Sequence, residues 1–388
     1  SALTDVPASD IDGLMAEAAR LYEAGDVRGA QSSFERVIAM NPTHAEALFG
    51  LGVLVEQGGD LITAKQHYRA AIEAAPGHAP SLVNLGNILR SERKYPEAIE
   101  LFEQNKNYSL DLKNYDACLK VTDGVDYIFN MACNMGGMGF IENNKAECML
   151  SVLINTNLLR ASVENKVSKY LFSSSACVYN TEKQKDTFVK GLKETDAYPA
   201  DPEDGYGWEK LFSERMCRHF TEDFGLETRV IRYHNVYGPM GTYDGGREKA
   251  PAALCRKIIS AKIKNEKSIE IWGDGKQTRS FMYIDDCIDG TIKVFNSNYS
   301  DVFNVGSEEQ VSINQLTEYI EDIAKIKMDK KYLLDKPKGV RGRSSDNSYI
   351  KEKIGWDTKI TLKDGLKKTY EWIYQEITSK PNNNKFTK

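Results

Sequence analysis

The sequence has no apolar run near the roughly 18 residues that span a bilayer, and its first residues, "SALTDVPASD", lack the basic and apolar regions of a signal peptide. A net charge of -5 gives no overall basic field for nucleic acid or acidic membranes. These absences predict a cytoplasmic protein whose partners are small molecules or proteins, with no nucleic acid and no membrane.

Paired cysteine motifs are also missing. The seven cysteines are odd in number and form no Cys-x-x-Cys pair, which favours reduced thiols over a disulfide framework. His44, His67 and His78 lack the spacing of metal ligands, so we expect packing or surface roles for them and no metal site.

Lysine and cysteine are scarce in only one part of the chain. Residues 1–104 contain two lysines, Lys65 and Lys94, and no cysteine, whereas both residue types are common from Lys106 onward. This break predicts two domains, 1–104 and 105–388, of different ancestry. A natural fusion, an artificial chimera and a discontinuous join all remain open.

The first domain repeats itself at an offset of 34 residues. Equivalent positions are Gly25 and Gly59; Ala30, Ala64 and Ala98; Phe34, Tyr68 and Phe102; Pro42 and Pro76; Leu48 and Leu82; Gly52 and Gly86. Small residues, an aromatic and a proline in this register are typical of stacked antiparallel helix pairs. Residues 8–104 resemble about three tetratricopeptide repeats, an all-α solenoid that serves as a scaffold or adaptor or carries a peptide groove.

Short apolar runs alternate with helical patterns in the second domain. We expect strands at "VDYIFNMA" (125–132), "KYLFSSS" (169–175) and "ETRVIRYHNV" (227–236), and helices at 148–165 and 206–225. This alternation predicts an α/β fold with a Rossmann-like parallel sheet, whose binding groups follow the carboxyl ends of the strands. "NMGGMGF", "SSSAC" and "HNVYGP" lie at such positions.

A tyrosine and a lysine share one helical face in "YGWEK". Tyr206 and Lys210 are four residues apart, so the ammonium is expected to lower the phenol pKa and to help hold a cofactor ribose. Together with the serine-rich strand end upstream, this pair is typical of hydride-transfer chemistry and resembles the extended short-chain dehydrogenases.

The longer phrases narrow the resemblance. "SSSACVY", "YGWEK", "GGREKAPAA", "WGDGKQTRSF" and "GVRGRSSDN", in this order, are similar to the GDP-mannose 3,5-epimerase family over about residues 107–378. The resemblance implies oxidation at C4 of the sugar by NAD, proton exchange at C3 and C5, and return of the hydride, converting GDP-mannose to GDP-L-galactose. A smaller C-terminal substrate domain is also implied.

The resemblance also implies roles for individual residues. Cys177 matches the family's base and Lys249 its acid, with Ser175 near the reacting sugar and Tyr206 and Lys210 in the redox step. Asp111 and Leu112 match the adenine-side contact of NAD. The implied substrate-binding residues are Gly136, Gly137, Ser175, Asn235, Glu248, Lys249, Lys257, Gln277, Arg279 and Arg343.

One family element has no counterpart in this sequence. Family members begin with a strand, a glycine-rich turn and a helix that approach the pyrophosphate of NAD, whereas the resemblance here starts at Asp111. We therefore expect a truncated sheet, impaired NAD binding and doubtful activity. The alternative to an epimerase is a non-enzymatic tetratricopeptide adaptor. A homodimer is a further expectation from the family.

Overall fold

The computed structural model describes residues 8–92, 94–103, 109–337 and 339–379. It contains two compact units, Ser1–Ser109 and Leu110–Lys388, each considered separately below. The boundary predicted at residues 104–105 lies outside the described residues.

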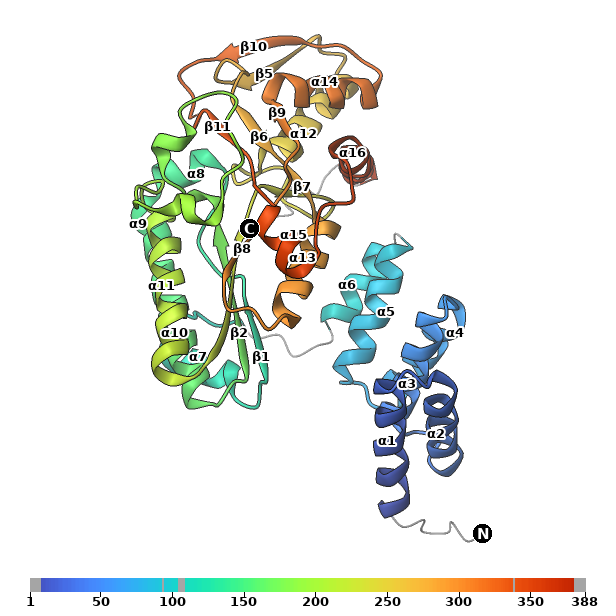
Figure 1. Ribbon diagram of the computed structural model, residues 1–388. Helices are drawn as coiled ribbons and strands as arrows, with labels where there is room; N and C mark the ends of the chain where they lie inside the picture. Colours follow the sequence, from blue (N-terminus) through green and yellow to red (C-terminus); the bar gives the residue numbers. More distant parts are fainter. Residues whose placement is uncertain (1–7, 93, 104–108, 338, 380–388) are drawn as a thin grey trace. The chain divides into compact units, whose positions relative to one another are not determined.

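The first unit consists of helices in sequential pairs (Figure 1). The helices are α1 (Ala8–Glu23), α2 (Val27–Met40), α3 (Ala45–Gln57), α4 (Leu61–Ala74), α5 (Ala79–Ser91) and α6 (Tyr95–Glu103). The helical solenoid expected from the 34-residue register is therefore confirmed.

Packing inside the first unit follows the repeat. Ala30 and Ala64 are fully buried where helices approach each other, and Tyr68 is buried between neighbouring pairs. A Cβ at Gly52 would lie 2.5 Å from the Tyr68 ring, and one at Gly50 would lie 2.5 Å from the Phe34 ring. Each glycine thus leaves room for an aromatic side chain of an adjacent helix.

Side chains at repeated positions cap the N-termini of the helices. Asp60 Oδ1 accepts from the Thr63 N–H at 3.1 Å, and His44 Nδ1 accepts from the Ala47 N–H at 3.2 Å. His78 caps α5 in the same way. Two of the three histidines expected to pack or face solvent therefore begin helices by satisfying backbone N–H groups.

A parallel sheet forms the centre of the second unit. Its strand order is β1 (Tyr127–Asn130), β2 (Lys169–Ser175), β3 (Glu227–Tyr233) and β8 (Val302–Val305), with every pair parallel. The predicted strands lie within two to three residues of these bounds. The predicted helix at 148–165 is divided at Leu150 into α9 (Lys145–Met149) and α10 (Ser151–Glu164).

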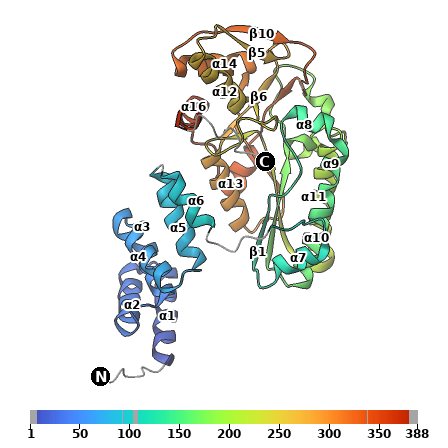
Figure 2. The same cartoon turned by 180° about the vertical axis from the view of Figure 1, so that it is seen from behind.

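Helices cover both faces of this sheet (Figures 1 and 2). One face carries α7 (Tyr115–Thr122), α10 and α11 (Tyr206–Phe224), and the other carries α13 (Ile284–Asn296) and α15 (Ser348–Ile354). Buried apolar side chains such as Phe172 and Phe303 fill the two layers. This arrangement is the one expected for a doubly wound sheet.

A smaller lobe stands beyond the carboxyl ends of the strands (Figure 1). Its strands are β5 (Ser268–Trp272) with β10 (Asp329–Leu333), and β6 (Thr278–Ser280) with β9 (Gln310–Ser312) and β11 (Gly342–Arg343). Its helices are α12 (Ala250–Ile263), α14 (Ile313–Ala324) and α16 (Leu362–Ser379). The remaining short elements are β4 (Val236–Tyr237), β7 (Met282–Tyr283), α8 (Met138–Asn143), η1 (Ala176–Val178), η2 (Thr181–Gln184) and η3 (Glu194–Ala197).

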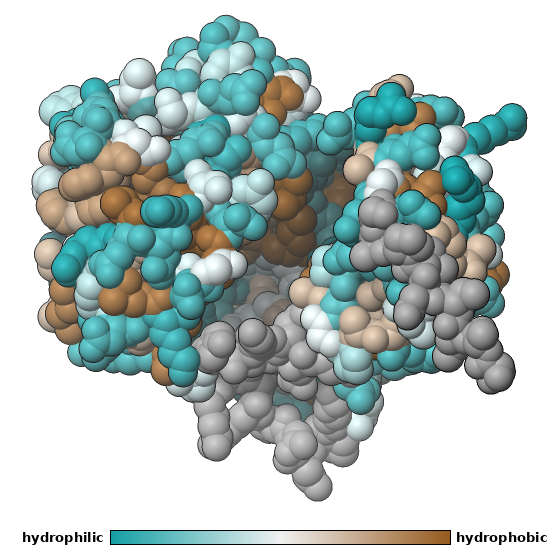
Figure 3. All heavy atoms as spheres, turned by 90° about the horizontal axis from the view of Figure 1, so that it is seen from below, coloured by the Kyte–Doolittle hydropathy of each residue, from teal (hydrophilic) through white to brown (hydrophobic). Residues whose placement is uncertain are grey.

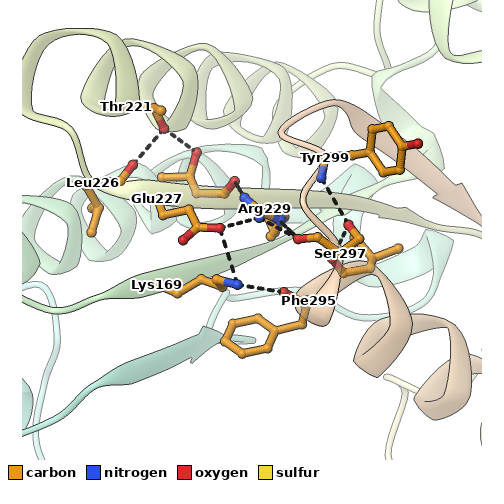
Figure 4. Close-up of polar contacts among 10 residues, drawn as sticks. Lys169, Thr221, Leu226, Glu227, Arg229, Phe295, Ser297 and Tyr299 are labelled. Atoms are coloured by element: carbon orange, nitrogen blue, oxygen red, sulfur yellow. Dashed lines mark hydrogen bonds and ion pairs between the residues drawn. The ribbon is translucent and has the colours of Figure 1, made fainter. Parts of the chain in front are cut away.

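Cationic side chains fix the end of α13 to the sheet (Figure 4). Lys169 Nζ donates to the Phe295 carbonyl at 3.2 Å, and Arg229 Nη2 donates to the Ser297 carbonyl at 2.6 Å. Both cations also pair with Glu227. Positive charge at a helix C-terminus satisfies its last carbonyls and complements the helix dipole.

The outer strand β1 carries exposed apolar side chains. Tyr127 is 58% exposed and Phe129 is 40% exposed.

In the space-filling view of Figure 3, hydrophilic residues cover much of the visible face and smaller apolar patches interrupt them. Within the described ranges, no helix is both long and apolar enough to cross a membrane.

Candidate active site

A cavity of about 410 Å³ lies in the second unit between the sheet's carboxyl edge and the smaller lobe. Residues from β2, η1, α11, α12, β5, β6 and β11 line it. All residues predicted to bind substrate are on its wall, as are four of the five predicted catalytic residues, Ser175, Cys177, Tyr206 and Lys249. Their roles in binding and catalysis stay predictions.

Cys177 follows β2 at the base of this cavity. Its backbone N–H donates to Ser175 Oγ at 3.2 Å, so the last serine of the strand holds the start of η1. Burial raises the pKa of the Cys177 thiol, the negative charge of Glu203 raises it further, and Arg343 partly offsets both. The protonated thiol is therefore favoured more than in an exposed cysteine.

Lys249 approaches the same cavity from the other lobe, as the residue that begins α12. Burial lowers the pKa of its ammonium, and the nearby thiols act in the opposite direction. Since the Cys177 pKa rises and the Lys249 pKa falls, the two groups move toward similar proton affinities. A thiol and an ammonium of similar proton affinity can serve as a base and an acid in the same reaction.

Tyr206 is the first residue of α11, and Lys210 lies one turn further along the helix. Lys210 Nζ lies 5.6 Å from the Tyr206 ring centroid and 4.7 Å from the Phe172 ring centroid. The phenol pKa lies well above its ordinary value, because burial disfavours the phenolate and neighbouring thiols add to this effect. The low phenol pKa expected from the spacing to Lys210 is therefore wrong for this structure, because burial sets the direction of the shift.

Three side chains hold Arg343 in the wall. Its Nε donates to Gln184 Oε1 at 2.6 Å, its Nη2 donates to Glu203, and its Nη1 lies 3.5 Å from Cys177 Sγ. Burial acts to lower the pKa of this guanidinium, but the charges and hydrogen bonds of Glu203 and Cys177 together outweigh burial, and the pKa is raised. Arg279, also on the wall, has its pKa lowered to about 10 by burial.

Other wall residues are fixed by backbone contacts. Gly137 N–H donates to the Arg247 carbonyl at 3.1 Å, and a Cβ at Gly137 would lie 2.7 Å from the Glu248 carbonyl oxygen. Asn235 Nδ2 donates to the Ser280 carbonyl at 3.1 Å. The glycines of "NMGGMGF" thus allow the β1 loop to pack directly against the "GGREK" segment.

Lys257 and Gln277 are anchored to β5. Lys257 Nζ donates to the Glu270 carbonyl at 2.8 Å, and Gln277 Nε2 donates to the Trp272 carbonyl at 2.9 Å. Gln277 Oε1 is buried without a hydrogen-bond partner among the described residues. This oxygen is therefore available to accept a donor from a bound molecule.

Three predicted cofactor or redox residues lie off the wall. Asp111 and Leu112 precede α7, where Leu112 packs against the core beneath α10. Lys210 is buried behind Tyr206. The sequence analysis in turn missed Glu203, Gln184 and Trp272, because segments far apart in the sequence carry them and only the fold brings them to the site.

The cysteines and other possible ligands do not form a metal centre in the part of the chain that the structure describes. No group of three or more His, Cys, Asp or Glu side chains there has a suitable arrangement for an ion. The seven cysteines are free thiols.

Comparison with known families gives two matches. The model described as "NAD dependent epimerase/dehydratase family" matches residues 77–306, and one described as "Tetratricopeptide repeat" matches residues 15–79. The first match begins within the helices of the first unit and continues through β8.

Individual proteins agree with the family match. GDP-mannose 3,5-epimerase 1 of Oryza sativa subsp. japonica is 49% identical over 269 residues, covering 69% of this chain and 70% of the relative. GDP-mannose 3,5-epimerase of Arabidopsis thaliana is 46% identical over the same length, with the same shares covered. The solved structure of UDP-glucuronic acid 4-epimerase from Bacillus cereus, in complex with UDP-glucuronic acid and NAD, aligns with a TM-score of 0.61 and 25% identity, covering 75% of this chain and 86% of the other.

The helical repeat, the parallel sheet with its cavity and these matches agree with one another. The chain belongs to the NAD dependent epimerase/dehydratase family, in its nucleotide-sugar epimerase branch, and carries a tetratricopeptide repeat segment ahead of the sheet.

Proposed function

We propose that this protein epimerises a GDP-mannose-type nucleotide sugar by proton exchange at C3 and C5, with Cys177 and Lys249 as the proton-transfer pair. The observation that carries the proposal is that both groups face one cavity from different lobes. The relatives named GDP-mannose 3,5-epimerase, at 46–49% identity, support this choice of substrate.

Two groups on different walls suit inversion at a carbon centre. One group removes a proton from one face of the sugar, and the other returns a proton to the opposite face. The raised pKa of Cys177 and the lowered pKa of Lys249 help this exchange, because neither proton transfer is then strongly uphill. Arg343 beside the thiol stabilises the thiolate when the proton has left.

NAD would supply transient oxidation at C4, which acidifies the neighbouring C–H bonds. The residues around Tyr206 fit the nicotinamide ribose. Lys210 Nζ is buried and has no hydrogen-bond partner among the described residues, although the Glu209 carboxylate lies 3.6 Å away. A ribose hydroxyl would satisfy this donor, while Tyr206 and Ser175 face the cavity and can exchange a proton with the sugar hydroxyl.

The opposite wall suits the nucleotide part of the substrate. Leu254, Trp272 and Phe281 supply apolar surface for a base, while Lys257 and Arg279 supply cations for a diphosphate. We infer that the nucleoside diphosphate lies along α12 and β5, and that the sugar reaches toward Cys177.

Isotope exchange tests the proposal directly. The protein is incubated with GDP-mannose and NAD in deuterated water, and we expect deuterium at C3 and C5 together with GDP-L-galactose. C177S and K249M should lose this exchange. C118S is the matched control, because the Cys118 thiol lies away from the cavity and donates to the Leu112 carbonyl, as a serine hydroxyl can.

The impaired NAD binding expected from the missing glycine-rich motif stays a prediction. Quantifying the dinucleotide released from the purified, heat-denatured protein tests it, and a stoichiometric amount would contradict it. If neither NAD nor GDP-mannose changes the melting temperature and no exchange occurs, the adaptor alternative, supported by the tetratricopeptide match, replaces the enzyme. The expected homodimer is tested by light scattering.

A further inference from the structure

An acidic side chain stands directly behind the wall that carries Cys177. Glu203 lies in the loop before α11, its side chain is about one-tenth exposed, and it pairs with Arg343. It does not line the cavity itself but faces the neighbouring hollow together with Gln184 and Arg341. A molecule bound in the cavity would therefore not contact Glu203, so this glutamate can act on the reaction only through the residues of the wall.

The contacts of Arg343 define that influence. Gln184 accepts a hydrogen bond from Nε and Glu203 accepts one from Nη2, so one edge of the planar guanidinium is occupied. The remaining edge, with Nη1, is turned toward Cys177 Sγ at 3.5 Å. Because the guanidinium is rigid, fixing one edge also fixes where the other edge points.

Backbone hydrogen bonds also connect Glu203 to Cys177 and to the start of α11, which carries Tyr206. Glu203 N–H donates to the Cys177 carbonyl at 3.0 Å, and Gly207 N–H donates to the Glu203 carbonyl at 2.9 Å. Gly207 immediately follows Tyr206 in α11. A shift of Glu203 would therefore move η1 and the start of α11 together, as well as Arg343.

We propose that Glu203 is a positioning residue for epimerisation: it holds the Arg343 guanidinium with its Nη1 edge against the Cys177 thiol and sets the charge around that thiol. The proposal rests on the proposed function for its place in the reaction. The arrangement itself is testable without turnover.

The charge balance gives the expected direction. The charged or titratable groups around the Cys177 thiol are Glu203, Arg343, Lys249, Tyr206 and Arg279. Glu203 raises the thiol pKa and Arg343 lowers it. Neutralising Glu203 removes the repulsion of the thiolate and leaves the Arg343 charge uncompensated, so both effects make the thiolate easier to form.

The test is alkylation of Cys177 by iodoacetamide from about pH 6 to about pH 10, followed by mass spectrometry of the Cys177 peptide. In E203Q we expect the pH midpoint of alkylation to fall by about one unit, which makes alkylation ~10-fold faster below the midpoint. E182Q is the matched control: it removes the same charge from the exposed Glu182 in η2, and its midpoint should equal the parent's. The Cys133 peptide is the internal reference.

Each outcome decides the proposal. An unchanged midpoint in folded E203Q, or an equal shift in E182Q, overturns it. If E203Q does not fold, E203D carries the test: its shorter side chain withdraws the charge, and a midpoint equal to the parent's overturns the proposal. A parent without epimerase activity but with the predicted E203Q shift would reject the proposed reaction and retain the positioning role. Where turnover is present, the acidic limb of the kcat profile should move by the same amount.

Discussion

Replacing Gly207 by alanine tests whether the start of α11 and the Cys177 loop form one rigid contact. A Cβ at position 207 would lie 2.3 Å from the Cys177 carbonyl oxygen and 3.0 Å from Pro202 Cβ. Ordinary van der Waals contact begins near 3.4 Å, so the backbone of η1 or of α11 has to move by about 1 Å. Neither neighbour is the end of a flexible side chain that can turn away.

The magnitude follows from two opposing effects. Overpacking of this kind costs about 1–3 kcal/mol, while alanine in place of glycine within a helix gains about 0.5–1 kcal/mol. On balance we expect G207A to lower the free energy of unfolding by about 1 kcal/mol. We also expect it to change the rate of Cys177 alkylation. The displaced loop also separates Cys177 from Tyr206, so proton exchange should fall.

Denaturant unfolding and the alkylation assay above measure both effects. G13A is the control, because Gly13 lies inside α1 and its added Cβ meets nothing within 4 Å. That variant should be as stable as the parent or more stable, with Cys177 alkylation unchanged. G207A with parental stability and parental alkylation would refute the rigid contact.

Three further predictions concern stability. Burial lowers the His234 pKa to about 3 from 6.5, so the folded protein keeps this ring neutral while the unfolded chain protonates it. As the pH drops from 6.5 to about 3, the unfolding free energy should therefore fall by about 1.4 kcal/mol per pH unit. Denaturation at several pH values should show a shallower fall in H234N and a fall as steep as the parent's in H219N. L82A, which empties a fully buried site in the repeats, should cost about 2–5 kcal/mol in denaturant unfolding, whereas I62A at a 72% exposed position should cost little. S312A removes the side chain that accepts from the Gln315 N–H at the start of α14 and should cost about 1 kcal/mol; an unchanged denaturation midpoint would contradict this role.

The elements of both units could be predicted from sequence because their signals are local. The 34-residue register placed Ala30 and Tyr68 inside the solenoid, and the apolar run ending in "SSS" located β2 with its bounds. Such patterns repeat over each element and reflect which side is buried, so a single sequence carries them.

The site was only partly predictable, since its energetics depend on contacts between distant segments. The motifs identified Cys177 and Lys249, and the fold places both on one cavity. Glu203 and Arg343, in contrast, are 140 residues apart, and no local pattern links them. The pKa of Tyr206 was expected to fall from its spacing to Lys210, yet burial by residues outside that helix raises it. Burial of this kind is a property of the tertiary fold rather than of the motif.

The two sides of the cavity come from different parts of the second unit, here called its two layers. Cys177 follows a strand of the central sheet, whereas Lys249 immediately precedes helix α12 of the smaller lobe. In the proposed reaction, neither layer supplies both proton-transfer groups by itself. A nucleotide sugar that touches both would act as a bridge across the unit, so occupancy should protect β2 and α12 from hydrogen exchange together and raise their melting temperature as one block.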